Sequence, residues 1–142
     1  MKQKMAILIA AIILYRQLVP LGQLILQMRL NDWSVYRDGV AATIRGENPY
    51  TQWFFDRYNY SPAATILFLP MSYFSTNLAE FLFTGLSLAT LWLTLTFILY
   101  SMKVKLPLAA RILFYALLVK MYSVKLTLIL GQVNLLVLFF SF

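Results

Sequence analysis

The length of its apolar runs is what most constrains the fold of this chain. Residues 5–28 and 78–100 are each long enough to cross the hydrocarbon core of a bilayer as a helix, which takes about 20 residues. Residues 106–122 form a third apolar run, and a fourth begins near residue 133. We therefore expect an all-α, multi-pass transmembrane fold with three full spans and a partial one. Because the fourth run is about ten residues short of a full span, we expect a single, truncated domain over residues 1–142.

The composition agrees with a membrane protein and excludes several kinds of site. Hydrophobic residues make up 61% of the chain and charged residues 12%, against about 25% charged residues in soluble proteins. The net charge of +7 comes from twelve basic residues that form no run or face, so membrane lipids are the expected partner and nucleic acid is not. Without histidine or cysteine, a general base must be a carboxylate, and a zinc site is not expected, because His and Cys are its ordinary ligands. We also expect no cofactor.

The first apolar run contains features that a spanning helix has to tolerate. Arg16, near its middle, costs about 3 kcal/mol on the insertion scale, whereas the twelve Leu, Ile and Val residues of the run return roughly 4–7 kcal/mol. Pro20 and Gly22 are expected to kink the helix without preventing it from spanning. A cleaved signal peptide is the alternative, but the run is longer than a typical apolar signal core and lacks a small-residue cleavage site.

A polar loop over residues 29–62 follows the first run and holds four of the five acidic residues. Asn31 or Asp32 is expected to cap a helix over about residues 33–45, with Gly46 as its C-terminal stop. We predict that this helix lies in the membrane interface and turns an apolar stripe towards the acyl chains. The stripe comprises Trp33, Tyr36, Val40 and Ile44.

The basic residues favour an extracytoplasmic position for this loop by a narrow margin. Four Lys and Arg residues lie in the N-terminal segment and the 102–105 turn together, and four lie in the loop. The two short segments have the higher density of positive charge, and the positive-inside rule places them in the cytoplasm. Lys120 and Lys125 argue mildly for the opposite orientation.

Asp32 is the candidate general base. It follows the first span, where a carboxylate would meet a lipid head group at the membrane surface. That position suits sugar transfer from a lipid phosphate, because the phosphate leaves as a stable anion and only the acceptor hydroxyl needs a base. The alternative is that Asp32 caps the following helix, a contribution of about 0.5–2 kcal/mol, and one carboxylate could do both. The other loop acids, expected to be solvated or paired with neighbouring arginines, are Asp38, Glu47 and Asp56.

Four cations are candidates for holding a donor phosphate, because a cation near the interface can neutralise it. They are Arg45, Arg57, Lys120 and Lys125. For the two lysines, an anchoring role with the side chain snorkelling to the surface is the alternative. The aromatic residues between positions 53 and 60 form either an interfacial belt or a platform for a sugar or polyprenyl chain. The polar residues at 131–134 are either part of a functional motif or make hydrogen bonds between helices.

A series of short motifs runs through the chain in order: Asp32, Tyr36, then Gly46, Asn48, Pro49 and Tyr50, then Tyr58, Tyr60 and Pro62, then Pro70, and finally Gly131, Gln132, Val133 and Asn134. Their order and spacing resemble the N-terminal part of glycosyltransferase family 87, the polyprenyl-phosphate-mannose-dependent mannosyltransferases of the GT-C superfamily. The resemblance implies an all-helical multi-pass fold, no obligatory metal, and an acceptor-activating Asp in the first extracytoplasmic loop, which Asp32 fits. The candidate substrate-binding residues from these motifs are Tyr36, Asn48, Tyr50, Tyr60, Gln132 and Asn134.

We therefore expect a membrane glycosyltransferase that moves a hexose, with mannose as the expected sugar, from a polyprenyl-phosphate donor to a lipid or glycan hydroxyl. It would act at the outer face of the cell membrane, with Asp32 as the base. Because the resemblance covers only the first part of the family, its donor site is expected to be incomplete. The alternative is a non-catalytic membrane subunit or a transporter fragment, which would use the same polar residues for packing or for a permeation path.

Overall fold

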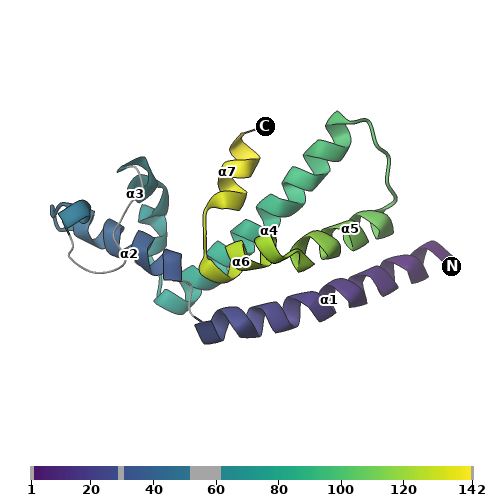
Figure 1. Cartoon of the computed structure of the whole chain (residues 1–142), viewed down its shortest axis with the longest axis horizontal. Helices are drawn as coiled ribbons and strands as arrows, with labels where there is room; N and C mark the ends of the chain where they lie inside the picture. The colour runs from purple at the N-terminus through teal and green to yellow at the C-terminus, as the bar shows by residue number, and fades with distance from the viewer. Residues whose placement is uncertain (1, 29–30, 52–61, 142) are drawn as a thin grey trace.

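The computed structural model describes residues 2–28, 31–51 and 62–141, and every regular element in those ranges is helical. In Figure 1, α1 (Lys2–Met28) runs along one side of the molecule and α4 (Thr76–Ser101) diverges from it. The shorter helices α2 (Asn31–Ile44) and α3 (Pro62–Phe68) lie together at the end where α1 finishes and α4 begins. The predicted all-α class is confirmed.

Two helices in the described part of the chain, α1 and α4, are individually long and apolar enough to cross a membrane. α1 has 27 residues and α4 has 26, so at about 1.5 Å per residue each is about 40 Å long, more than the roughly 30 Å hydrocarbon core. α1 contains Pro20 and continues past Gly22 to Met28, so the predicted kink does not interrupt it. The proline removes one backbone hydrogen bond from a helix that is bonded on both sides of it.

The third predicted span differs from the structure. In place of one helix over residues 106–122 there are α5 (Leu108–Lys120) and α6 (Tyr122–Leu130), with a bend of 70° between them. Met121, at the bend, has φ −58° and ψ 135°, an extended conformation that ends one helix and starts the next. By length and composition the pair is either one broken span or a re-entrant segment. The polar residues Lys120, Ser123 and Lys125 interrupt the apolar pattern around Met121. They mark the end of the third run, but they do not indicate that a second helix follows at a steep angle.

α6 ends in a turn at Gly131, whose φ of 69° is left-handed. The N–H of Gln132 donates to the carbonyl of Thr127 at 3.0 Å, the closing bond of a Schellman motif. α7 (Asn134–Phe140) follows and packs against α4. A seven-residue helix therefore begins at the predicted start of the fourth apolar run.

α2 is the helix predicted within the polar loop, and it begins two residues earlier than expected, at Asn31. It ends as predicted just before Gly46, which has a left-handed φ of 73°. The N–H of Glu47 donates to the carbonyl of Ala42 at 2.9 Å, again closing a Schellman motif. A short 3-10 turn, η1 (Pro49–Thr51), follows, and a second, η2 (Leu69–Tyr73), connects α3 to α4.

The predicted contact of the α2 stripe with acyl chains is wrong. Trp33, Tyr36 and Val40 are at most 2% exposed, although Ile44 at the end of the stripe is 59% exposed. The stripe packs against the protein itself. The ring of Phe68 in α3 and the ring of Phe83 in α4 contact Trp33 and Tyr36. Helical periodicity identifies an apolar face but cannot say whether lipid or protein covers it.

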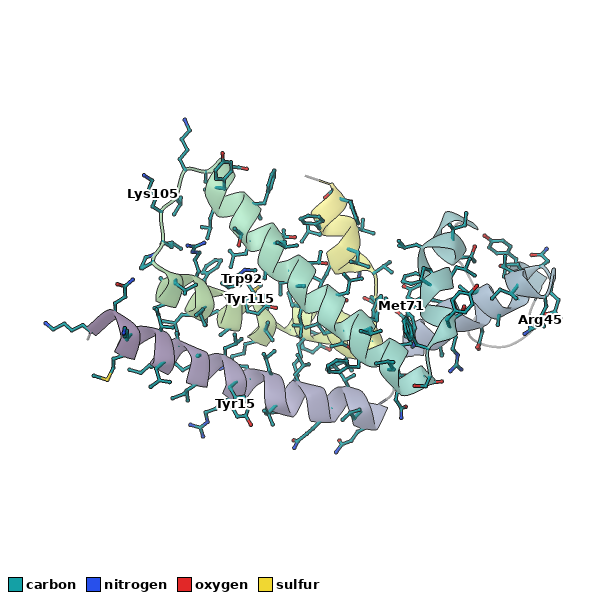
Figure 2. The ribbon with its side chains drawn as sticks, turned by 180° about the vertical axis from the view of Figure 1, so that it is seen from behind. Tyr15, Arg45, Met71, Trp92, Lys105 and Tyr115 are labelled. Carbon is teal, nitrogen blue, oxygen red and sulfur yellow. The ribbon has the colours of Figure 1, made fainter. Side chains whose placement is uncertain are left out.

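α4 and α5 are joined by large side chains near the middle of both helices. Figure 2 shows Trp92 and Tyr115 together between them, with ring centroids 5.3 Å apart and planes at 81°. The hydroxyl of Tyr115 donates to the carbonyl of Leu88 at 2.7 Å. Thr90 and Thr94 on α4 donate their hydroxyls to the carbonyls four residues earlier, which satisfies polar groups in a helix that has apolar surroundings.

Candidate functional site

Asp32 lies in the first turn of α2, just beyond the end of α1. Because the helix starts at Asn31, Asp32 is inside the helix and does not occupy the capping position that the sequence predicted. A carboxylate in the first turn is still stabilised by the helix dipole, by about 0.3–1 kcal/mol. Asp32 is half-buried, and within the described ranges no hydrogen bond or ion pair holds its side chain.

The helix that carries Asp32 is held by aromatic packing. The ring of Tyr36 stacks on that of Phe68 with centroids 4.6 Å apart. Trp33 packs edge-on to Phe68 at 5.8 Å and lies 5.1 Å from the ring of Phe83 in α4. Tyr36 was a candidate substrate-binding residue, but with 1% exposure its ring is a core element that positions α2. This packing fixes the start of α2 relative to α3 and α4.

A polar contact also ties α2 to the start of α4. Nη1 of Arg37 donates to Oγ1 of Thr76 at 2.8 Å, while its Nε lies 3.6 Å from a carboxylate oxygen of Asp38. The Asp38 side chain is 59% exposed, so the expectation that it is solvated or paired with an arginine is confirmed.

Arg45 is engaged by its neighbour Glu47. Its Nε and Nη2 donate to the two carboxylate oxygens at 3.0 and 2.8 Å, as the expected pairing requires. The hydrogen bond from Arg45 lowers the pKa of Glu47, and Glu47 raises the pKa of Arg45. Both side chains are about half exposed, so a phosphate could bind Arg45 only by sharing it with Glu47. Its role as a phosphate clamp stays a prediction.

Asn48 and Tyr50 form a compact turn after Gly46. The backbone N–H of Tyr50 donates to Oδ1 of Asn48 at 3.0 Å, an Asx-turn that spans Pro49. The side chain of Tyr50 is 45% exposed. This geometry explains why Asn precedes Pro in the motif, whereas contact of either side chain with a substrate stays a prediction.

Several predicted residues lie at positions 52–61, outside the described residues. They include two substrate-binding candidates, Arg57 and Tyr60, the acid Asp56, and the aromatic cluster. Their assignments therefore stay as predicted from the sequence.

Lys120 and Lys125 are brought to one cavity by the bend between α5 and α6. The cavity has a volume of about 330 Å³ and is also lined by Gln17, Pro20 and Tyr122. Pro20 is eight residues before the end of α1, so the cavity lies about 12 Å along the helix from that end. No described acidic side chain pairs with either lysine, and both lysine side chains are exposed, so both can reach an anion in the cavity.

Gln132 and Asn134 lie where α6 turns into α7. Nδ2 of Asn134 donates to Oε1 of Gln132 at 2.9 Å, so the two amides bond each other across the turn. They do not bridge two helices as the alternative explanation had it, and their predicted substrate contacts stay untested.

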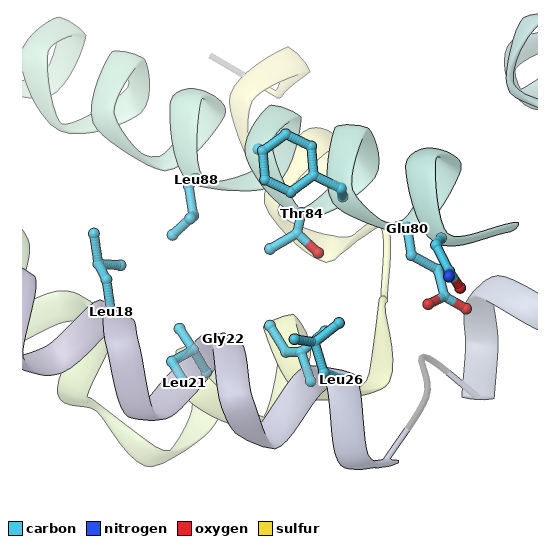
Figure 3. A pocket seen from close by; sticks show the side chains of 11 residues that line it. Leu18, Leu21, Gly22, Leu26, Glu80, Thr84 and Leu88 are labelled. Carbon is cyan, nitrogen blue, oxygen red and sulfur yellow. The ribbon is translucent and has the colours of Figure 1, made fainter. Parts of the chain in front are cut away.

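Sequence reasoning missed a groove between α1 and α4. It has a volume of about 440 Å³ and is lined almost entirely by hydrocarbon, with Asn77, Glu80 and Thr84 as its polar residues. In Figure 3, Leu26 and Glu80 lie at the end of the groove where α1 finishes, and Leu18 and Leu88 lie at the other. Glu80 is the single acid outside the polar loop, and an ionisable side chain in an apolar helix is itself a signal of function.

No three acidic side chains gather into a possible metal site within the described residues. Of the residues proposed for the reaction, the structure brings Lys120 and Lys125 to one cavity, which suits an anion, whereas Asp32 lies at the start of α2 and does not line that cavity.

The chain was also compared with known proteins. Residues 58–141, more than half of the chain, match the model of glycosyltransferase family 87. No curated protein and no solved structure matches. The matched region includes α5 and α6, which carry Lys120 and Lys125 of the cavity described above, called here the basic cavity. It also includes the turn with Gln132 and Asn134, but it begins after Asp32. The chain belongs to glycosyltransferase family 87, a family of membrane glycosyltransferases.

Proposed function

We propose that this protein transfers a hexose, with mannose as the expected sugar, from a polyprenyl-phosphate donor to a hydroxyl of a lipid or glycan. The reaction takes place at the outer face of the cell membrane. Family membership supports a glycosyltransferase, and the finer assignment of donor, base and sugar is our proposal.

The observation that carries the proposal is the cavity shared by Lys120 and Lys125. Two ammonium groups that line one cavity can donate charge-assisted hydrogen bonds to one phosphate. α6, which holds Lys125, also contacts α2, which holds Asp32. One short helix therefore borders both the proposed phosphate site and the helix of the proposed base.

The proposed chemistry needs one carboxylate. Asp32 takes the proton of the acceptor hydroxyl as its oxygen forms a bond to the anomeric carbon of the sugar. The bond from that carbon to the phosphate oxygen breaks, and its electron pair leaves with polyprenyl phosphate. The lysines stabilise the negative charge of the phosphate as it leaves, so no general acid is required.

Asp32→Asn, introduced into the chromosomal gene, tests the base. The change keeps the shape of the side chain, and removing a general base typically lowers turnover about 100-fold to 10,000-fold. Hexose transfer from a radiolabelled polyprenyl-phosphate hexose is measured in isolated membranes. Asp38→Asn is the matched control, because it makes the same change on the same helix at an exposed pair. Near-normal transfer by Asp32→Asn would assign the base to another carboxylate.

The same assay tests the phosphate site with Lys120→Gln and Lys125→Gln. Each loses one charge-assisted hydrogen bond to phosphate, worth about 1.5–3 kcal/mol, so the KM for the donor should rise on the order of tenfold to a hundredfold. An unchanged KM would leave the lysines as anchors. Absence of transfer by the wild-type membranes from any polyprenyl-phosphate hexose would favour a non-catalytic membrane subunit.

A further inference from the structure

The groove between α1 and α4 is a space that the two helices leave open. α1 makes its extensive contacts with α5 and α6, and few with α4. On the groove side, leucines from both helices face each other without meeting, as Figure 3 shows for Leu18 and Leu88. A volume of about 440 Å³ falls within the range of small-molecule sites, about 300–1,000 Å³.

Two glycines widen this groove. Gly22 on α1 and Gly85 on α4 both line it, and a Cβ added at either one would meet no atom within 4 Å. Glycine in membrane helices commonly allows two backbones to approach closely. Here neither glycine is in such a contact, so the two leave room for something else.

The groove is chemically asymmetric along its length. Asn77 and Glu80 lie near the start of α4 and Leu26 lies near the end of α1, so the polar end faces the side on which α2 begins. None of the described residues that line the groove is basic. A carboxylate there repels a phosphate, whereas a hydroxyl can donate to Glu80 and accept from the amide of Asn77.

We infer that this groove binds the hydrocarbon chain of an uncharged, hydroxyl-bearing lipid whose head group meets Asn77 and Glu80. The anionic donor belongs to the basic cavity, where Lys120 and Lys125 supply the opposite charge. The lipid in the groove is then the acceptor, and the acceptor hydroxyl is carried by a membrane lipid and not by a soluble glycan. That role rests on the proposed function, whereas binding of the lipid does not.

Binding is tested with two photoactivatable lipids that share the same acyl chains, each with the reactive group in a chain. One is a diacylglycerol and the other is phosphatidic acid, at equal mole fraction in phosphatidylcholine vesicles that contain the wild-type protein. Adducts are mapped by mass spectrometry to residues 18–26 and 77–88, the groove segments of α1 and α4. We expect the diacylglycerol to label these segments roughly fivefold to tenfold more than phosphatidic acid, because of repulsion by Glu80.

Two variants test the groove and its polar end separately. Gly85→Leu places a larger side chain in the groove, where its Cβ would meet no atom within 4 Å, and should abolish labelling by the diacylglycerol. Ala89→Leu is its control, since Ala89 is exposed on the same helix and does not line the groove. Glu80→Gln should remove the preference between the two lipids. Equal labelling by both lipids in the wild type, or labelling that persists in Gly85→Leu, would overturn the inference.

Asp32→Asn separates this inference from the proposed function. Asp32 does not line the groove, so the variant should label like the wild type while sugar transfer collapses. If Asp32→Asn keeps its transfer activity but the wild type shows the lipid preference, the groove assignment stands and the base assignment falls. Loss of labelling in Asp32→Asn would show that the labelled site is not the groove, which overturns the inference.

Discussion

At the scale of single residues, both Gly46 and Gly85 have space for a side chain, but their backbone conformations require glycine to different degrees. Gly46 has a φ of 73° and ends α2, whereas Gly85 lies within α4. A methyl group at either position would meet no atom within 4 Å. The effect of adding one is therefore set by the backbone conformation alone.

We predict that Gly46→Ala destabilises the protein by about 1 kcal/mol, because an L-residue pays about 1–2 kcal/mol in the left-handed region and regains part of it through a stiffer unfolded chain. Gly85→Ala should stabilise it by about 0.5–1 kcal/mol, because alanine favours a helix interior. Both are measured by reversible unfolding in detergent micelles, followed by circular dichroism. Equal effects at the two positions would mean that the conformation of Gly46 is not what stops α2.

Residue identity predicted some of these conformations and not others. Gly46 could be identified as a helix stop because a glycine with Asn48-Pro49 two residues later is a strong turn signal. Lys103 also has a positive φ, 56°, and ends α4 with the same pattern of hydrogen bonds. A lysine gives no such signal, and only the packing of the whole chain determines its conformation.

For the candidate site residues, the sequence predicted which side chains carry reactive or polar groups better than it predicted how buried those side chains are and what they contact. Asp32 is where the boundary between span and loop predicts it, at the start of a helix. Tyr36 was selected by its place in a motif, and its burial against Phe68 depends on where α3 packs. Glu80 was overlooked because its neighbours along the chain are apolar, and its place in a groove depends on how far α1 and α4 diverge.

At the scale of helices, the docking of α2 depends on Phe83. This ring is 1% exposed and contacts both Trp33 and Phe68. Phe81, two residues earlier on the same helix, is 74% exposed. Phenylalanine can therefore be replaced by alanine at one buried and one exposed position of the same helix.

We predict that Phe83→Ala costs about 3–5 kcal/mol, through lost burial and the cavity that remains, and that α2 loosens first. Hydrogen exchange of the α2 amides should become faster, while exchange in the middle of α1 is unchanged. Phe81→Ala should change stability by no more than about 0.5 kcal/mol, as expected for an exposed position. Unaltered exchange in α2 of Phe83→Ala would mean that other contacts hold this helix.

The apolar pattern predicted α1 and α4 well, because a continuous run of that length has few alternatives to a long helix. It ended the third run at residue 122, close to the break, but did not predict that α6 continues beyond it at a 70° angle, because Lys120, Ser123 and Lys125 interrupt the apolar pattern there. That break matters for function, because it brings Lys120 and Lys125 to the same cavity. Local propensity sets the helices, and tertiary packing sets where a helix is interrupted.

At the scale of the whole molecule, the crossing of the membrane by α4 determines on which side the segments before and after it lie. If α4 crosses once, residues before Thr76 and residues after Ser101 lie on opposite sides. From the dense positive charge at Lys2, Lys4 and the 102–105 turn, the positive-inside rule predicts that α2 lies outside the cytoplasm. The proposed reaction depends on this orientation, because Asp32 must meet its substrates at the outer face.

We predict that a cysteine at Thr43, exposed near the end of α2, reacts with a membrane-impermeant maleimide on intact cells. A cysteine at Ser101, exposed at the far end of α4, should react only after the membrane is permeabilised. The chain has no native cysteine, so neither variant has a background. Labelling of both positions from one side would show that α4 does not cross the membrane. The reverse pattern would keep the crossing but place Asp32 in the cytoplasm, where the outer-face reaction could not occur.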